Sequence, residues 1–121
     1  MERVGVVDYA AGNLTSVETA LKRRKANFIV SSVPEELDRS ERLIFPGVGE
    51  ARAAMRELAK RGLDSFLRSY VASGRPVLGI CIGCQIVLSL SEENDTPCLD
   101  IVSGRVRRFP GDMGLDRKSV V

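Results

Sequence analysis

The stretch P-V-L-G-I-C-I-G-C-Q, residues 76–85, decides the fold of this chain. An apolar run ends at Ile80, Cys81 follows, and the next residues are apolar on most sides, as in a buried helix. Gly79 and Gly83 flank Cys81 at two residues on each side, which is the cysteine form of the G-x-S-x-G turn between a strand and a helix. We therefore predict that Cys81 lies at the carboxyl end of a strand, where open α/β sheets bind their ligands.

Outward from this turn, short apolar runs alternate with segments of helical spacing. Such runs are typical of buried parallel strands, and the periodic segments of helices packed on a sheet. We predict an α/β fold with a mostly parallel sheet and flanking helices. The predicted strands are residues 3–8, 27–31, 42–45 and 76–80, and the predicted helices are 14–25, 51–61, 63–73 and 82–90. A loop over 92–97 and an edge strand over 104–109 follow.

Length and charge limit the classes of protein to be considered. The 121 residues suffice for one domain, and 18 basic against 16 acidic residues give a net charge of +2, too small to indicate nucleic acid or an anionic membrane. No apolar stretch approaches the ~20 residues of a membrane span, and the N-terminus has no targeting core, so we expect a cytoplasmic protein. The basic run 22–25 indicates a solvated helix end, and the run 105–108 indicates either a solvated strand edge or a partner-facing patch. Neither run has interleaved aromatic residues, so nucleic acid is not favoured.

The cysteines leave several interpretations open. Cys81 is either a nucleophile or a small core residue beside two packing glycines. Cys81 and Cys84 also form C-x-x-C, the pattern of thiol redox proteins, although that motif normally follows the first strands of its domain. Cys98 is the only further soft ligand, which argues against a metal site. The chain contains no histidine, the usual base for a cysteine nucleophile, so the chemistry lies elsewhere or the sequence is incomplete.

A second glycine-containing loop, F-P-G-V-G at residues 45–49, ends another predicted strand. Its glycines allow the backbone to approach a ligand closely and to turn an N–H inward. In a doubly wound fold this loop would lie beside Cys81 and donate to an oxyanion, together with the backbone N–H of Ile82. Alone, the same pattern is also that of an ordinary strand-to-helix turn.

Four segments together resemble class I glutamine amidotransferases, and within them the glutamine amidotransferase subunit of imidazole glycerol phosphate synthase. They are V-D-Y-A-A-G-N-L-T-S-V at residues 7–17, F-P-G-V-G at 45–49, L-G-I-C-I-G-C-Q at 78–85 and G-R-V-R-R-F at 104–109. The resemblance covers residues 1 to about 110. It implies a flavodoxin-like α/β fold, incomplete at the C-terminus.

The resemblance also implies roles for particular residues. Cys81 would form a glutamyl thioester and release ammonia, and Gln85 would face the bound glutamine. Residues 11–13 would lie near a (β/α)8-barrel cyclase, which receives the ammonia. The residues implied to frame the oxyanion hole are Val48, Gly49 and Ile82. The family uses no metal or organic cofactor. Two alternative functions stay open: a glutaminase subunit of another synthase, or a thiol redox protein that uses Cys81 and Cys84.

The chain departs from the family in three places. Cys84 stands where methionine is more common, and Ala10 and Ala11 stand where a glycine-containing pair is common. The family's catalytic His and Glu lie beyond residue 121. Residues 116–121 do not resemble the family's continuation, so we expect residues 1–115 to be the N-terminal part of a single domain and 116–121 a non-native tail. As written, the chain is expected to be an inactive fragment of a heterodimeric enzyme.

Overall fold

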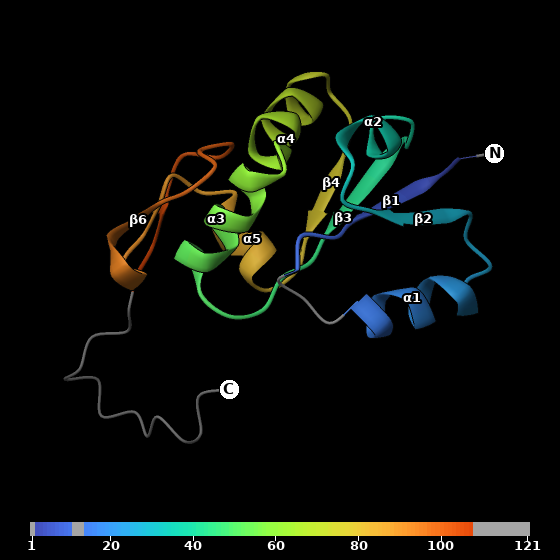
Figure 1. Cartoon of the computed structure of the whole chain (residues 1–121), viewed down its shortest axis with the longest axis horizontal. Helices are drawn as coiled ribbons and strands as arrows, with labels where there is room; N and C mark the ends of the chain where they lie inside the picture. The colour runs from blue at the N-terminus through green and yellow to red at the C-terminus, as the bar shows by residue number, and fades with distance from the viewer. Residues whose placement is uncertain (1, 11–13, 108–121) are drawn as a thin grey trace.

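A four-stranded parallel sheet lies at the centre of the computed structural model, which describes residues 2–10 and 14–107 (Figure 1). The strand order is β2-β1-β3-β4. The strands are β1 (Val4–Val7), β2 (Phe28–Ser31), β3 (Arg42–Phe45) and β4 (Val77–Gly79). All three pairings are parallel, which confirms the predicted α/β class and the mostly parallel sheet.

Helices connect these strands and pack on both faces of the sheet. In Figure 1 the strands lie between α1 and the group formed by α3, α4 and α5. The helices are α1 (Leu14–Arg23), α2 (Pro34–Leu37), α3 (Ala51–Lys60), α4 (Leu63–Ala72) and α5 (Ile82–Ile86). The single turn α2 was not predicted from the sequence, although its first residue is a proline, which suits the start of a helix. In the described part of the chain, no helix is long and apolar enough to cross a membrane.

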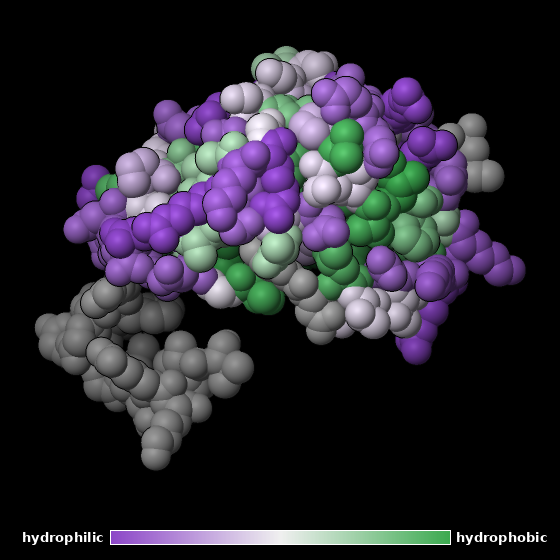
Figure 2. Space-filling view, in the orientation of Figure 1, coloured by the Kyte–Doolittle hydropathy of each residue, from purple (hydrophilic) through white to green (hydrophobic). Residues whose placement is uncertain are grey.

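The core lies between the sheet and the helices α3, α4 and α5. Leu43 and Phe45 of β3 are buried there with leucines of the helices. The side chain between them, Ile44, faces the opposite side of the sheet because neighbours on a strand alternate. Ile44 pairs with Leu78, whose side chain is 59% exposed. Figure 2 shows further apolar side chains at the surface near β2 and α1.

The segment after Cys81 departs from the prediction. The predicted helix over 82–90 ends at Ile86, and a second sheet of order β6-β5-β7 follows. Its strands are β5 (Leu90–Ser91), β6 (Thr96–Pro97) and β7 (Arg105–Val106). The predicted loop over 92–97 contains the 3₁₀ turn η1 (Glu93–Asp95) and β6. The apolar run misled the prediction because a short buried strand and a buried helix cannot be told apart by periodicity.

The predicted edge strand at 104–109 is confirmed over Arg105–Val106. It pairs in parallel with β5, as Ser91 lies opposite Val106. Residues 108–109 and the expected tail 116–121 lie outside the described residues.

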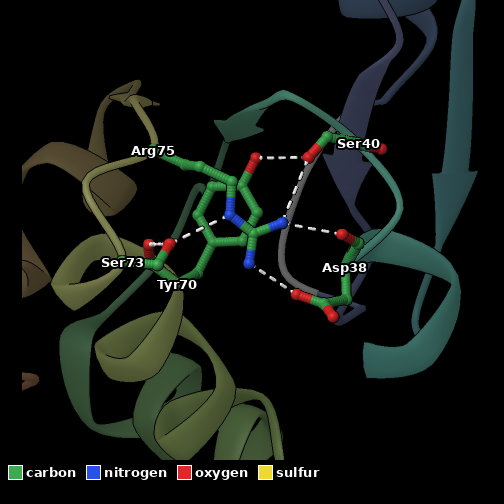
Figure 3. Close-up of polar contacts among 5 residues, drawn as sticks. All are labelled: Asp38, Ser40, Tyr70, Ser73 and Arg75. Carbon is green, nitrogen blue, oxygen red and sulfur yellow. Dashed lines mark hydrogen bonds and ion pairs between the residues drawn. The ribbon is translucent and has the colours of Figure 1, made fainter.

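A polar cluster joins the turns at the amino end of the sheet, just before β3 and β4 begin (Figure 3). The Tyr70 hydroxyl donates to the Ser40 carbonyl oxygen over 2.7 Å. The Arg75 guanidinium lies 3.9 Å from the centre of the Tyr70 ring and forms an ion pair of 2.6 Å with Asp38. It also donates to the carbonyl oxygen of Asp38 over 2.7 Å. These contacts tie together the turns that lead into β3 and β4, the last two strands in the order of the sheet.

Candidate active site

Cys81 lies between the end of β4 and the start of α5, in a strained backbone conformation. Its φ is 55° and its ψ is −121°. An L-residue rarely adopts such angles, which cost of order 1–3 kcal/mol. The residue is exposed and its thiol is free. The structure therefore has the strained strand-to-helix turn that the sequence predicts, with the sulfur-bearing residue at the carboxyl end of the sheet.

The two flanking glycines are required by close packing. A Cβ at Gly83 would overlap the carbonyl oxygen of Phe45, and a Cβ at Gly79 would lie 2.8 Å from the Cα of Cys84. The start of α5 is thus pressed onto the ends of β3 and β4. This contact holds the Cys81 turn in place, because the backbone on either side of it cannot shift without breaking the core.

The loop at residues 45–49 lies beside Cys81, as predicted. The Ile80 N–H donates to the Phe45 carbonyl oxygen over 3.0 Å, and the Ile82 N–H donates to the Gly47 carbonyl oxygen over 3.2 Å. The second bond refines the prediction, because the Ile82 N–H has a protein acceptor in this conformation. It becomes available to a ligand only when the Gly47 carbonyl turns away.

The other predicted site residues gather at the same end of the sheet. Val48 is 56% exposed, and Gly49 has a φ of 96° with open space where a side chain would begin. Gln85 is exposed on the first turn of α5, and its N–H donates to the Cys81 carbonyl oxygen over 3.2 Å. The predicted partner loop, residues 11–13, lies outside the described residues.

Sequence reasoning missed a role for Tyr9, which follows β1 and lies beneath this loop. Tyr9 is 2% exposed, its ring centre is 5.4 Å from that of Phe45, and burial raises the pKa of its hydroxyl. The hydroxyl abuts Gly47, where a Cβ would overlap it. It has no hydrogen-bond partner among the residues that the structure describes. An aromatic residue at the carboxyl end of the first strand was the available signal, but only the strand register shows which loop it supports.

The three cysteines have two kinds of environment. Cys81 and Cys84 are exposed, whereas Cys98 is buried and donates its S–H to the Thr96 carbonyl oxygen over 3.4 Å. Burial also raises the pKa of the Cys98 thiol. Across residues 2–10 and 14–107, no three His, Cys, Asp or Glu side chains lie together as metal ligands would.

A parallel sheet with an exposed, strained cysteine between a strand and a helix defines an α/β protein with the backbone turn of the G-x-S-x-G pattern. Comparison with known families gives the particular assignment. The model of the SNO glutamine amidotransferase family matches residues 9–113, and the chain belongs to this family.

Individual relatives agree with that assignment. The imidazole glycerol phosphate synthase subunit HisH of Geobacillus thermodenitrificans (strain NG80-2) is 51% identical over 112 residues, 92% of this chain and 53% of the relative. The protein of the same name from Nitratidesulfovibrio vulgaris (strain DP4) is 48% identical over 106 residues, 88% of this chain and 50% of the relative. The chain thus spans about half the length of these relatives.

Solved structures share the fold. A glutamine amidotransferase crystal structure superposes with a TM-score of 0.72 at 24% identity, over 84% of this chain and 54% of the other. A putative peptidase E protein from Listeria monocytogenes EGD-e superposes with a TM-score of 0.68 at 14% identity, over 84% of this chain and 63% of the other. At these identities the likeness concerns the fold alone.

Proposed function

We propose that this chain carries the nucleophile of a glutaminase. The observation that carries the proposal is the strained, exposed Cys81 at the carboxyl end of β4, in a chain of the glutamine amidotransferase family. The Cys81 sulfur attacks the side-chain carboxamide carbon of glutamine, and the C–N bond breaks to release ammonia. Water then hydrolyses the glutamyl thioester to glutamate and restores the thiol.

Backbone groups stabilise the negative oxygen that forms at each step. The Gly47–Val48 peptide presents its carbonyl to the Ile82 N–H in this structure. Rotation of that peptide by about half a turn would free the Ile82 N–H and point the Val48 N–H toward the same space, since the two groups of a peptide point in opposite directions. Two aligned donors are the usual means of stabilising such an oxyanion. The rotation turns the backbone about the ψ of Gly47 and the φ of Val48, and a glycine at the first of these positions has the greater conformational freedom. Gly49 completes the loop that frames the oxyanion, and Gln85 faces the bound glutamine.

The chain contains no histidine, which is the usual base for a cysteine nucleophile, and this supports a proton acceptor outside these 121 residues. We assign that part to a His–Glu pair in the half of the family domain that this chain does not span. A general base is worth ~10²–10⁴-fold in rate. The 121 residues alone are therefore expected to release negligible ammonia from glutamine. In this proposal residues 1–115 are the N-terminal part of one domain, and 116–121 are a non-native tail.

The partner in this proposal is the cyclase subunit of imidazole glycerol phosphate synthase, a (β/α)8 barrel of the histidine pathway. The support is that relatives at 48% to 51% identity are named as subunits of that synthase. The complex would be a cytoplasmic heterodimer that passes ammonia from Cys81 to the cyclase. No metal or organic cofactor takes part in the proposed hydrolysis.

The test begins with the source gene beyond codon 115, to find a continuing frame with His and Glu. The complete product and its cyclase are then assayed for ammonia released from glutamine. Cys81→Ala is expected to abolish the release, and Cys98→Ser, a buried thiol away from the site, to retain it. Full ammonia release by the Cys81→Ala protein would contradict the proposal.

A further inference from the structure

The glutaminase chemistry uses one thiol, yet the Cys81 turn holds two. Cys84 lies three residues after Cys81, and both residues are exposed with free thiols. The close packing of Gly79 against the Cα of Cys84 concerns the backbone and does not require a sulfur at that position. The second thiol therefore has no part in the site described above.

The backbone brings the two cysteines to disulfide distance. The Cys84 N–H donates to the Cys81 carbonyl oxygen over 2.9 Å, which closes a turn of four residues. The first and fourth Cα atoms of such a turn lie within about 7 Å of each other. Disulfides join Cα atoms about 4.4–6.8 Å apart. The Cα atoms of the two cysteines therefore lie within the range that a disulfide spans.

The core holds the residues between the two thiols. Ile82 is 6% exposed, and Gly83 is packed so closely that a Cβ would overlap the Phe45 carbonyl oxygen. The spacing of Cys81 and Cys84 is consequently set by the sheet rather than by a loose loop. A fixed spacing favours bonding within this pair over bonding with another molecule, because little chain entropy is lost on closure.

We propose that Cys84 is a resolving thiol that protects Cys81 from irreversible oxidation by forming a reversible Cys81–Cys84 disulfide. This goes beyond the glutaminase function and does not depend on it. It also differs from a redox enzyme that acts on other proteins, which the family membership does not favour. The oxidant is a hydroperoxide, and the reductant that restores the site is a small dithiol.

The reaction balances in two steps. The Cys81 thiolate attacks one oxygen of hydrogen peroxide, the O–O bond breaks, and the leaving hydroxide takes up a proton to become water. Cys81 is then a sulfenic acid, oxidised by two electrons. The Cys84 thiolate attacks the Cys81 sulfur, the S–S bond forms, the S–O bond breaks, and a second water leaves. Two thiols and one peroxide thus give one disulfide and two waters, and a dithiol reverses the oxidation by thiol–disulfide exchange.

Without Cys84 the same peroxide oxidises Cys81 beyond the sulfenic acid. A sulfenic acid that finds no thiol is oxidised to the sulfinic acid, which dithiols do not reduce. Cys98 does not substitute for Cys84, because it is buried in the core with its S–H bonded to Thr96. It provides an internal control, a thiol of the same chain that peroxide is expected to leave reduced.

The experiment treats the 121-residue chain with hydrogen peroxide, alkylates the remaining thiols and maps the peptides by mass spectrometry. The expected product has lost two hydrogen atoms, with Cys81 joined to Cys84 and Cys98 alkylated. Dithiothreitol restores nearly all of the Cys81 thiol. In Cys84→Ser the expected Cys81 peptide gains two oxygen atoms, and dithiothreitol restores almost none of it. Cys98→Ser should behave as the parent chain.

Two results would overturn the proposal. One is a parent chain in which Cys81 is oxidised while Cys84 is still alkylated. The other is a Cys84→Ser chain whose Cys81 recovers with dithiothreitol as fully as in the parent. The peptide map of the parent chain alone decides the first point, whatever the stability of the variant. Ammonia release is not measured, so a failure here is distinct from a failure of the glutaminase proposal.

Discussion

The two ends of the central sheet differ in how their polar groups are satisfied. At the amino end, the hydroxyl of Tyr70 and the guanidinium of Arg75 both have partners (Figure 3). At the carboxyl end, Cys81 has strained backbone angles and the hydroxyl of Tyr9 has no partner within the described residues. Strain and unmet hydrogen bonds cost stability, and they persist where a function needs them. The contrast places stabilising contacts at one end of the sheet and the candidate site at the other.

One buried polar group at the amino end, the Ser40 hydroxyl, also has no partner among the described residues. It lies against Gly5, where an added Cβ would be 2.8 Å from the Ser40 hydroxyl oxygen. The difference between the ends is therefore one of degree, and paired substitutions measure it.

The largest change in the free energy of unfolding is expected when a glycine is replaced by alanine, and each end of the sheet offers one such glycine. Gly83→Ala forces a Cβ into the Phe45 carbonyl oxygen, and the loss should reach about 3 kcal/mol, the upper range for an overpacked core. In Gly74→Ala at the amino end, the new Cβ meets no atom within 4 Å, and the only cost is that alanine must adopt a φ of 89°. The free energy of unfolding should therefore fall by about 1 kcal/mol. Urea unfolding of both variants measures the free energies. Equal losses would show that the Cys81 turn is not held by close packing.

Replacement of tyrosine by phenylalanine should change the free energy of unfolding in opposite directions at the two ends of the sheet. Tyr70→Phe removes the 2.7 Å bond to the Ser40 carbonyl and should cost about 1 kcal/mol. Tyr9→Phe removes a buried hydroxyl without a described partner and should raise the free energy of unfolding by about 1 kcal/mol. Thermal and urea unfolding give both values. A destabilised Tyr9→Phe chain would mean that this hydroxyl is already bonded, and the contrast between the two ends would weaken.

Substitution of Cys81 by glycine and by alanine measures the backbone strain of the Cys81 turn. Both remove the thiol, but only glycine adopts a φ of 55° with a ψ of −121° without strain. Cys81→Gly should therefore be more stable than Cys81→Ala by about 1 kcal/mol, after the entropy that glycine loses on folding. The measurement is the difference between their urea midpoints at constant m-value. Alanine as the more stable of the two would remove the argument that the turn is strained.

Much of the fold was predictable because local patterns encode it. The strand over 42–45 matches β3 residue for residue, and the glycines at 79 and 83 located the Cys81 turn. The family resemblance of four segments is confirmed by the family model over residues 9–113. These features depend on neighbours within a few residues, so a single sequence contains them.

Contacts between distant segments were harder to predict from the sequence. The end of α5 at Ile86 and the strand β5 depend on pairing with residues far along the chain, as when Ser89 N–H donates to the Gly104 carbonyl over 2.9 Å. The bond from the Ile82 N–H to Gly47, and the position of Tyr9 beneath that glycine, require the strand register. Composition and periodicity contain no information on register, which explains why these parts of the site appeared only in the structure.

The smallest effect is expected at the exposed ion pair of the amino end. Asp38→Asn removes the charge that faces Arg75 at 2.6 Å, where the side chains are 59% and 33% exposed. Solvent screens such pairs, so the loss should stay below about 1 kcal/mol and shrink further in 1 M salt. Arg75 keeps its bond to the Asp38 carbonyl oxygen and its contact with the Tyr70 ring. A loss of more than about 2 kcal/mol would show that this charge, rather than the buried Tyr70 hydroxyl, is what ties together the turns that lead into β3 and β4.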